Sequence, residues 1–339
     1  MNRLSVVFTA PKQVSLIEEP QPEPGPGQLL VQTMLSAISP GTELLIYRGE
    51  FPDDLPVDES IPSLAGRLGY PLRYGYSAVG RVTAIGAQVD PQWQGRYAFS
   101  FQPHASSFTA SPDELFPLPA DIEPHDAVFL PNMETAANLC MDGAPLLGEH
   151  VVVFGQGIVG LLTTALLGRF PLESLVSLDC YPLRREASLQ AGAHASLEAG
   201  IPQTLEQLRA LQPEGADLTF ELSGSPVALD QAIAATGYAG RLVLGSWYGK
   251  KPVTLDLGGR FHRSRIRLVS SQVSSIAPHL SGRWTKQRRF EVAWEMLRRV
   301  GPQRWITHRL PVSEAAQAYR LLDQAPGEAI QVVLEYPHG

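Results

Sequence analysis

The chain has 339 residues and a formal net charge of −7, and 44% of its residues are hydrophobic and 18% charged. This length predicts two domains with a sizeable core, and the composition is typical of a globular protein. The apolar stretches are too short to span a membrane, and the N-terminus lacks the apolar segment of a signal peptide. Two cysteines, Cys140 and Cys180, provide neither a disulfide framework nor a cysteine-rich zinc knuckle. We therefore expect a cytoplasmic protein that does not act at a membrane.

Positive charge is concentrated in residues 260–309. This segment contains 12 Lys and Arg residues and two Glu residues, so its charge is about +10 and that of the remainder is about −17. An anionic substrate, or the phosphates of a cofactor, would be attracted to such a patch. A solvated basic helix face is the alternative. We do not expect nucleic-acid binding, because the patch occupies one part of an otherwise acidic, enzyme-like chain.

The first 120 residues predict a turn-rich, all-β domain. Alternating apolar and polar residues indicate strands at 4–8, 14–17, 29–35, 74–86, 96–99 and 107–110. Residues 36–48 are typical of a loop that enters a short helix. Residues 51–69 form a long, acidic, proline-marked excursion, which indicates either a lid or a disordered surface insertion.

A glycine-rich turn lies near the middle of the chain. Residues 151–154 predict a buried strand, residues 161–167 predict a buried helix, and three glycines stand between them at G-x-G-x-x-G spacing. The first glycine permits a sharp turn, the second lets the backbone approach a pyrophosphate, and the third lets helix and strand pack closely. The helix start offers free N–H groups to the phosphates. The predicted phosphate-binding residues are Gly155, Gly157, Ile158, Val159 and Gly160.

Strands and helices alternate after this turn. The predicted strands are 175–178, 218–222, 241–245, 266–270 and 330–334, and the predicted helices are 184–191, 204–211, 228–235, 290–300 and 313–323. Two further helices, 124–129 and 134–141, are predicted before the turn. The alternation predicts an α/β fold with a doubly wound parallel sheet. Ligands of such sheets bind at the carboxyl ends of the strands. Those ends lie at Gly155, Asp179, Ser223 and Gly245.

Five short motifs resemble those of the medium-chain dehydrogenase/reductase superfamily. They are Gly41-Thr42-Glu43, the stretch Gly75 to Gly80, Thr135-Ala136, the glycine turn and the stretch Ile306 to Arg309. The resemblance extends over essentially the whole chain and implies an alcohol dehydrogenase-like oxidoreductase. It implies a GroES-like, β-rich catalytic domain over 1–130 that is completed by 274–339. A Rossmann dinucleotide-binding domain would occupy 131–273.

The residues at the superfamily's zinc-ligand positions are poor zinc ligands. Ser39 or Pro40 stands at the expected cysteine. Tyr76 stands at the expected histidine, and Glu134 is the only anionic residue near the third position. Zinc needs three good N, S or O ligands in an open tetrahedral site, so we expect no metal ion and a zinc-less branch of the superfamily. The Ser-x-Ile-Ser-x-Gly-Thr-Glu stretch from Ser36 more weakly resembles bacteriochlorophyllide a dehydrogenase.

The resemblance also assigns cofactor contacts. Asp179, about 20 residues beyond the glycines, takes the position of the ribose-binding acid, and Arg184 that of a basic residue beside the same ribose. A carboxylate there repels a 2′-phosphate, which favours NAD(H), although Arg184 and Arg185 leave NADP(H) open. Thr135 matches a residue that packs on the nicotinamide. Gln331 stands where many relatives place a basic residue on the pyrophosphate.

Hydride transfer without zinc requires hydrogen-bond donors that stabilise the developing oxyanion and supply a proton. The resemblance makes Thr42 a proton relay to the substrate oxygen, and Tyr76, His104 and Tyr47 are further candidate donors. An imidazole can act as a general acid near neutral pH, so His104 is either a general acid or an exposed loop histidine. Asn132 and Glu134 are candidates for orienting the substrate. Trp247-Tyr248 either cover the nicotinamide or the substrate, or pack in the core. Arg283-Trp284 and Arg288-Arg289 are candidates for contacting an acidic substrate.

We expect a small-molecule ligand, and three functions remain open for this protein. One is interconversion of an alcohol and a ketone, and another is reduction of a quinone or a conjugated enone. The third is non-catalytic NAD(H) binding. The family resemblance further suggests a homodimer formed through the sheet edge at residues 266–270.

Overall fold

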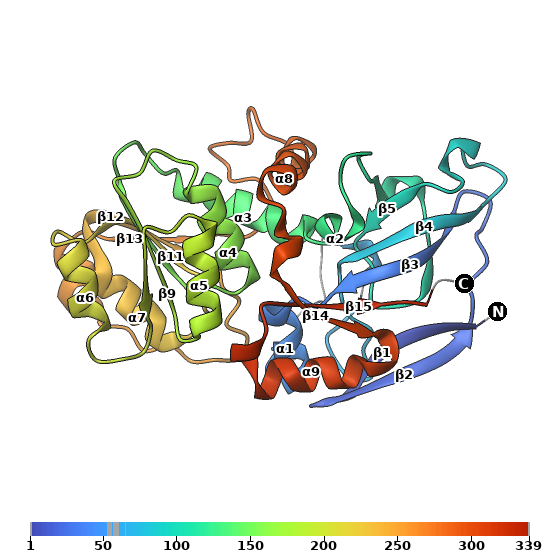
Figure 1. The fold of residues 1–339 in the computed structure, drawn as a ribbon, viewed down its shortest axis with the longest axis horizontal. Coiled ribbons are helices and arrows are strands. Elements are labelled where there is room, and N and C mark those ends of the chain that lie inside the picture. Colours follow the sequence, from blue (N-terminus) through green and yellow to red (C-terminus); the bar gives the residue numbers. More distant parts are fainter. Residues whose placement is uncertain (1, 53–55, 57–60, 65, 338–339) are drawn as a thin grey trace. The chain divides into compact units, whose positions relative to one another are not determined.

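The computed structural model describes residues 2–52, 56, 61–64 and 66–337. Part of the excursion at 51–69 therefore lies outside the described residues, and both interpretations of it, a lid or a disordered surface insertion, stay predictions. The chain divides into two compact units, coloured by sequence in Figure 1. The first unit comprises Met1–Pro131 and Gly301–Gly339, and the second comprises Asn132–Val300.

The boundary of the returning segment differs from the sequence prediction. We expected residues 274–339 to complete the first domain, whereas residues up to Val300 belong to the second unit. The reason is helix α8 (Lys286–Val300), which packs against α4 (Ile158–Leu167) and carries Arg289 into an ion pair with Glu134. Both contacts tie the segment to the second unit.

The first unit is built on a seven-stranded sheet and a separate hairpin. The sheet order is β14-β15-β3-β4-β5-β7, with β6 paired to β3, so strands from both ends of the chain share one sheet. In Figure 1, β3, β4 and β5 lie side by side. The strands are β1 (Asn2–Ala10), β2 (Gln13–Pro20), β3 (Leu29–Ala37), β4 (Ala78–Ile85), β5 (Tyr97–Ser100), β6 (Ser107–Ala110), β7 (Leu115–Pro117), β14 (Ile306–Pro311) and β15 (Gln331–Glu335). The helices of this unit are α1 (Pro40–Arg48), α2 (Pro124–Ala127) and α9 (Ala315–Gln324).

The C-terminal helix α9 closes the core of the first unit. Its Tyr319 is fully buried, stacks on Tyr47 of α1 at a centroid distance of 5.6 Å, and meets Phe8 of β1 edge-on at 5.0 Å. Aromatic pairs at these distances add to the stabilisation from burial. The end of the chain is therefore part of the same core as its beginning, as the resemblance implied.

The second unit contains a six-stranded parallel sheet with the order β10-β9-β8-β11-β12-β13. The first strand of the unit lies inside the sheet and the order reverses there, which is the dinucleotide-binding arrangement. Its strands are β8 (His150–Phe154), β9 (Ser174–Asp179), β10 (Ala195–Glu198), β11 (Ala216–Glu221), β12 (Thr236–Leu244) and β13 (Arg267–Ser270). The remaining helices are α3 (Leu130–Gly143), α5 (Pro182–Ala191), α6 (Thr204–Leu211) and α7 (Pro226–Ala235). The predicted α/β fold with a doubly wound parallel sheet is confirmed.

Local sequence signals located most elements but missed those with weak patterns. The strand expected at 74–86 begins only at Ala78, because Gly75 adopts a φ of +115° that a strand does not allow. Strand β10 was not predicted, since it is short and has no buried residue. Within the described part of the chain, none of the helices has the length and apolarity needed to cross a membrane.

Candidate functional site

The glycine turn of the second unit has the geometry that its spacing predicts. Gly155 follows β8 with a φ of +89°, and an added Cβ would lie 2.6 Å from the backbone nitrogen of Ser223. An added Cβ at Gly160 would lie 1.9 Å from the carbonyl oxygen of Gly155. Neither position accepts a side chain, because the contacted atoms are backbone.

The second glycine of the turn differs from the other two. Gly157 has a φ of −65°, is the N-cap residue of helix α4, and has no atom within 4 Å of an added Cβ. Glycine is therefore not required here by the fold. The open space lies at a helix N-terminus, where the N–H groups of Ile158 and Val159 have no carbonyl partner within the helix. This is the one part of the turn that the fold leaves free for an anion.

Asp179 ends β9 and lies beside the glycine turn. Its Oδ2 accepts the N–H of Gln156 at 2.7 Å and its Oδ1 accepts the N–H of Tyr181 at 2.9 Å. The carboxylate is therefore fixed in orientation, and each of its oxygens keeps a further lone pair for a ribose hydroxyl. Arg184 lies at the start of α5 with its guanidinium 5.0 Å from the ring of Tyr181.

A buried glutamate that the sequence analysis missed organises the next strand end. Glu221 ends β11 with no exposed surface, and its Oε1 accepts the backbone N–H of Ser223 at 2.8 Å. Its Oε2 accepts the hydroxyl of Tyr248 at 2.8 Å. Burial, and next the Glu221 charge, raise the pKa of Tyr248 above its usual value. Tyr248 thus has a structural partner, whereas neighbouring Trp247 is 37% exposed.

Two of the remaining expected cofactor contacts, Gly245 and Thr135, lie in the same unit. Gly245 follows β12, and an added Cβ there would lie 2.5 Å from the side chain of Leu139. Thr135 lies half-buried on α3. Gln331 belongs instead to the first unit, where its side chain is fully buried and donates to the carbonyl of Ile38 at 2.7 Å. Its amide nitrogen is therefore committed to the backbone of the first unit.

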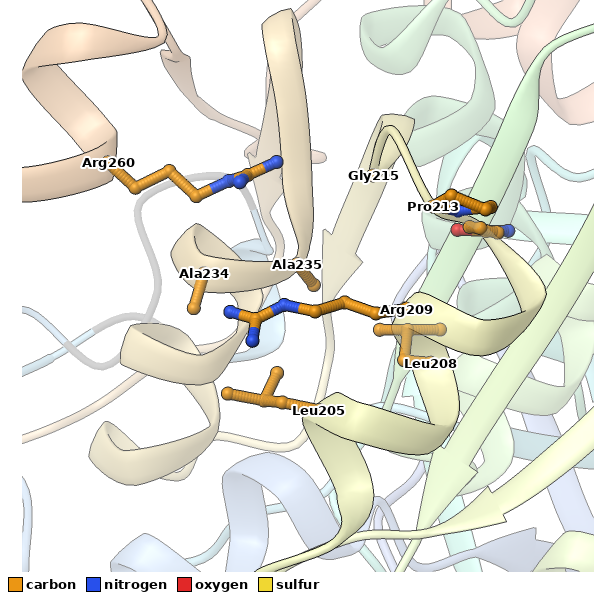
Figure 2. A pocket seen from close by; sticks show the side chains of 9 residues that line it. Leu205, Leu208, Arg209, Pro213, Gly215, Ala234, Ala235 and Arg260 are labelled. Carbon is orange, nitrogen blue, oxygen red and sulfur yellow. The ribbon is translucent and has the colours of Figure 1, made fainter.

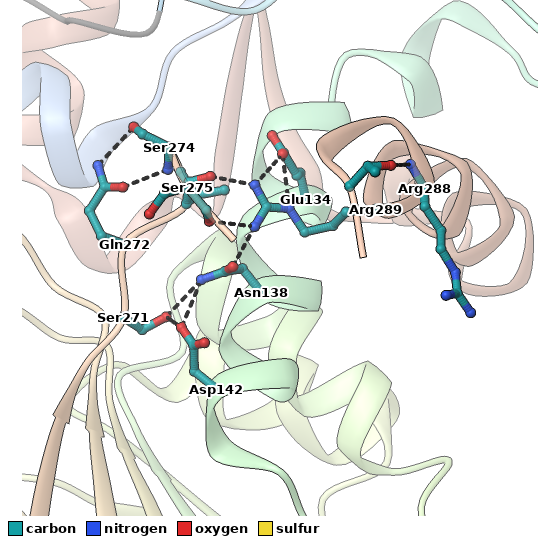
Figure 3. A network of polar contacts seen from close by, with 11 residues as sticks. Glu134, Asn138, Asp142, Ser271, Gln272, Ser274, Ser275, Arg288 and Arg289 are labelled. Carbon is teal, nitrogen blue, oxygen red and sulfur yellow. Dashed lines mark hydrogen bonds and ion pairs between the residues drawn. The ribbon is translucent and has the colours of Figure 1, made fainter. Parts of the chain in front are cut away.

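Glu134 is held in a buried ion pair on α3. The Arg289 Nε and Nη2 atoms lie 3.0 and 2.7 Å from Glu134 Oε1, and Nη1 donates to the carbonyl of Ser275 at 3.0 Å (Figure 3). Arg289 also donates to Asn138 and to the carbonyl of Val273. Burial raises the pKa of Glu134, and the Arg289 charge opposes that rise without cancelling it.

This ion pair changes two sequence interpretations. The carboxylate that we proposed for substrate orientation or catalysis already has a cationic partner. The expectation that Arg289 reaches an acidic substrate is wrong, because its side chain is fully buried. Arg288, the next residue expected there, stacks on Trp284 at 4.0 Å and donates to the carbonyl of Arg283. Asn132 is 5% exposed at the start of the unit.

Three hydroxyl groups gather at the start of α1 in the first unit. The Tyr76 hydroxyl donates to Ser39 Oγ and lies 3.5 Å from Thr42 Oγ1. Tyr76 and Thr42 are half-buried, so the cluster is accessible from solvent. The structure thus brings together two predicted catalytic residues and adds Ser39, which the sequence analysis had considered only as a missing zinc ligand.

A buried carboxylate and imidazole support this hydroxyl cluster. Glu43 Oε1 accepts the N–H of Ser39 at 2.7 Å, and Glu43 Oε2 lies 3.0 Å from His104 Nε2. His104 Nδ1 lies 2.7 Å from the Ser36 hydroxyl. Neither side chain has exposed surface. The alternative of an exposed loop histidine is therefore wrong, and His104 has both nitrogens hydrogen-bonded within the protein.

Two tyrosines complete the buried network. Tyr319 donates its hydroxyl to Glu43, and Tyr336 is hydrogen-bonded to Ser36 at 2.9 Å. Burial, and next the Glu43 charge, raise the pKa of Tyr319 well above its usual value, so its hydroxyl remains a donor. Glu43 accepts three hydrogen bonds in all, which is what a buried carboxylate requires. Tyr47, another candidate donor, is buried in the aromatic core instead.

A small cavity beneath α6 and α7 is not a cofactor site. It is shown in Figure 2 and holds about 20 Å³, which is room for little more than a water molecule. Leu205, Leu208, Ala234 and Ala235 line much of it.

Comparisons with known proteins agree with this geometry. Residues 159–292 match the family model described as zinc-binding dehydrogenase. An L-threonine 3-dehydrogenase from Stenotrophomonas maltophilia is 23% identical over 358 aligned positions, which cover 96% of this chain and 97% of the relative. A 2R,3R-butanediol dehydrogenase from Bacillus subtilis has a TM-score of 0.80 at 17% identity, covering 99% of this chain and all of the other. An alcohol dehydrogenase from Escherichia coli CFT073, solved with NADH, has a TM-score of 0.79 at 19% identity, covering 98% and 99%.

Residues 159–292 of the chain are thus similar to zinc-binding dehydrogenases, and the whole chain is similar in fold to solved dehydrogenases. At these identities the structural likeness establishes a fold of GroES-like and Rossmann domains. The finer resemblance to bacteriochlorophyllide a dehydrogenase stays a prediction.

The first unit fits a catalytic zinc ion poorly. Hydroxyl groups of Ser39 and Tyr76 stand at positions where the sequence resemblance led us to look for zinc ligands, and the carboxylate of Glu43 is hydrogen-bonded to the imidazole of His104. Among residues 2–52, 56, 61–64 and 66–337, no group of three or more His, Cys, Asp or Glu side chains is placed to hold a metal ion. Zinc is normally bound by three such side chains.

Proposed function

We propose that this protein is an NAD(P)(H)-dependent oxidoreductase that interconverts an alcohol and a ketone without catalytic zinc. The observation that carries the proposal is the turn from Gly155 to Gly160, whose middle glycine leaves open space at an uncapped helix start. The names of its relatives, which are threonine, butanediol and alcohol dehydrogenases, favour alcohol oxidation over the reduction of a quinone or an enone.

The dinucleotide would be held by residues at the carboxyl ends of the parallel strands. The N–H groups of Ile158 and Val159 would meet its phosphates, and the fixed carboxylate of Asp179 would accept ribose hydroxyls. When bound, such a cofactor supplies or accepts a hydride. The cofactor residues we propose are Thr135, Gly155, Gly157, Ile158, Val159, Gly160, Asp179, Arg184, Ser223 and Gly245.

Replacing Asp179 by alanine should change the cofactor preference. The wild-type carboxylate repels a 2′-phosphate, so removing it is expected to raise the ratio of NADP(H) to NAD(H) affinity by about tenfold or more. Fluorescence titration with NADH and NADPH measures both affinities. Asp179→Asn should raise the ratio as well, because it lacks the same charge while its amide oxygen still accepts one backbone hydrogen bond. A wild-type protein that already prefers NADPH would contradict the assignment.

The hydroxyl cluster would stabilise charge on the substrate oxygen. Thr42 offers a hydrogen-bond donor from a half-buried position, and Tyr76 would donate to the substrate oxygen by turning its O–H away from Ser39. Ser39 is held by its backbone N–H, which donates to the buried carboxylate of Glu43. His104 is enclosed and bonded on both sides, so we assign it a positioning role in place of the general-acid role. Hydrogen-bond donors fixed in advance are effective stabilisers of a developing oxyanion.

Tyr76→Phe tests the role of this cluster. The loss of one oxyanion donor is expected to lower kcat by about 100-fold while KM changes little. Steady-state NADH oxidation over a ketone panel provides both constants. Tyr97→Phe, at an exposed tyrosine of β5, is a matched control that should leave both unchanged. Equal activity of Tyr76→Phe and wild type would show that the Tyr76 hydroxyl takes no part in the reaction.

The alternatives give different results in the same assays. Turnover confined to quinones or enones would replace the alcohol/ketone assignment. NADH binding without turnover on either panel would identify a non-catalytic NAD(H)-binding protein. Failure to bind either nucleotide would reject the proposal as a whole.

We also propose that the protein is a homodimer joined through β13. This strand ends the sheet order, pairs with β12, and exposes 41% of Leu268. An open strand edge readily pairs with another chain. Light scattering that gives the mass of one chain at micromolar concentration would contradict this proposal.

A further inference from the structure

A second hollow in the second unit has no part in the proposed reaction. Its volume is about 540 Å³, which falls in the range of small-molecule sites. It lies beside the start of β13 and is lined by Ala239, Phe261, His262, Arg265, Ile266 and Arg267. Two arginines and a histidine thus stand around an apolar floor, with no carboxylate among the lining residues.

The two arginines of this hollow carry positive charge that the protein does not neutralise. In the described ranges of the chain, neither Arg265 nor Arg267 has a carboxylate within ion-pair distance. Nearby Arg260 is different, since its guanidinium donates to the carbonyl of Thr236 at 2.7 Å. The nearest acid in sequence, Asp256, accepts the N–H of Gly259. Unpaired guanidinium groups are well suited to bind a carboxylate or a phosphate.

The backbone around the hollow is held in an unfavourable conformation. Non-glycine residues with φ near +55° are rare, and the described residues contain four: Lys12, Ala144, Ala239 and Arg265. Two of the four, Ala239 and Arg265, line this hollow with φ of 55° and 53°. A hydrogen bond of 2.7 Å from Ala239 N to the carbonyl of Ser264 connects the two segments. Such strain is concentrated at ligand sites.

We propose that this hollow binds a small organic anion, one that joins a phosphate or carboxylate to an apolar group. The guanidinium groups of Arg265 and Arg267 would pair with the anionic oxygens. The partly buried ring of Phe261 and the side chain of Ile266 would contact the apolar portion. The site lies in the second unit and does not depend on the proposed reaction. Arg267 is the first residue of β13, the strand proposed to join two copies, so the oligomeric state is measured together with binding.

Calorimetric titration of the full chain with phenyl phosphate tests this site, with phenol as the neutral analogue. Phenyl phosphate is expected to bind at least about tenfold more tightly than phenol, and the double variant Arg265→Asn/Arg267→Gln is expected to lose at least about tenfold in affinity. Asparagine tolerates a positive φ, so Arg265→Asn removes the charge without new backbone strain. Arg263→Gln is the matched control, since this exposed arginine lies in the same segment outside the hollow.

Three results would overturn the proposal. One is the absence of phenyl phosphate binding to the wild-type protein. Another is an equal loss of affinity in Arg263→Gln, which would indicate general attraction to the basic segment. The third is a double variant that keeps its affinity but changes its oligomeric state, which would show that a second copy of the chain covers these arginines.

Discussion

Gly160→Ala is expected to lower the free energy of unfolding by about 3 kcal/mol or more. The added methyl group would overlap backbone atoms, which cannot move aside as a flexible side chain can. The new methyl group would lie 1.9 Å from the carbonyl oxygen of Gly155, so the start of α4 must move away from the end of β8. Cofactor affinity should be lost together with stability. Urea unfolding followed by circular dichroism measures the first effect, and NADH fluorescence measures the second.

Gly157→Ala is the matched control, since it adds the same methyl group earlier in the same turn, directly before Ile158 at the start of α4. No atom lies within 4 Å of the new Cβ and φ is −65°, so stability should be unchanged or slightly higher. NADH affinity should nevertheless fall by about tenfold or more, since the methyl group enters the space proposed for the pyrophosphate. A Gly157→Ala protein with unchanged stability and unchanged affinity would place the phosphates elsewhere.

Arg289→Met is expected to destabilise the protein by about 3–5 kcal/mol, because it leaves the buried carboxylate of Glu134 without its partner. The methionine retains much of the arginine's apolar volume, so the lost charge dominates. The segment at Val273 and Ser275 would also lose its hydrogen bonds to the guanidinium. Thermal unfolding at pH 7 measures the effect. A loss below about 1 kcal/mol would show that water replaces the guanidinium.

The loss caused by Arg289→Met should depend on pH. Burial already raises the pKa of Glu134 above 4.5 in the folded protein, and without Arg289 it should rise further, although Lys286 still lowers it slightly. The folded state then binds more protons than the unfolded state between pH 4.5 and the raised pKa, so stability falls as the pH increases through that window. The variant should therefore be closer to wild type at about pH 5 than at about pH 8. In Glu134→Gln/Arg289→Met, this pH dependence should disappear.

The features that sequence predicted correctly depend on local spacing. Gly155, Gly157 and Gly160 lie within one short turn: Gly155 and Gly160 have the steric roles that the pattern specifies, and Gly157 leaves open space at the start of the helix. The parallel sheet followed from the alternation of apolar strands with helices, because strands buried on both faces must be apolar throughout. Asp179 could be placed because its distance along the chain from the glycines is set by one helix and one strand.

The buried polar pairs could not be predicted in this way. Glu43 and His104 are 61 residues apart, and Glu134 and Arg289 are 155 apart. A single sequence does not reveal which carboxylate meets which cation across such separations. One signal was present for the second pair: an arginine on the apolar face of the amphipathic helix α8, beside Phe290 and Ala293, requires a buried partner. Because Glu43 is followed by four apolar residues of α1, its burial could likewise have been anticipated.

Turnover by metal-stripped protein is the measurement that decides most directly whether this dehydrogenase relative works without zinc. NADH oxidation over a ketone panel would be measured before and after treatment with a strong chelator, with zinc content determined on the same samples. We expect equal rates, with far less than one zinc ion per chain in both. A preparation with about one zinc ion per chain, whose activity disappears on chelation and returns with added zinc, would contradict the proposed role of Thr42, Tyr76 and Ser39.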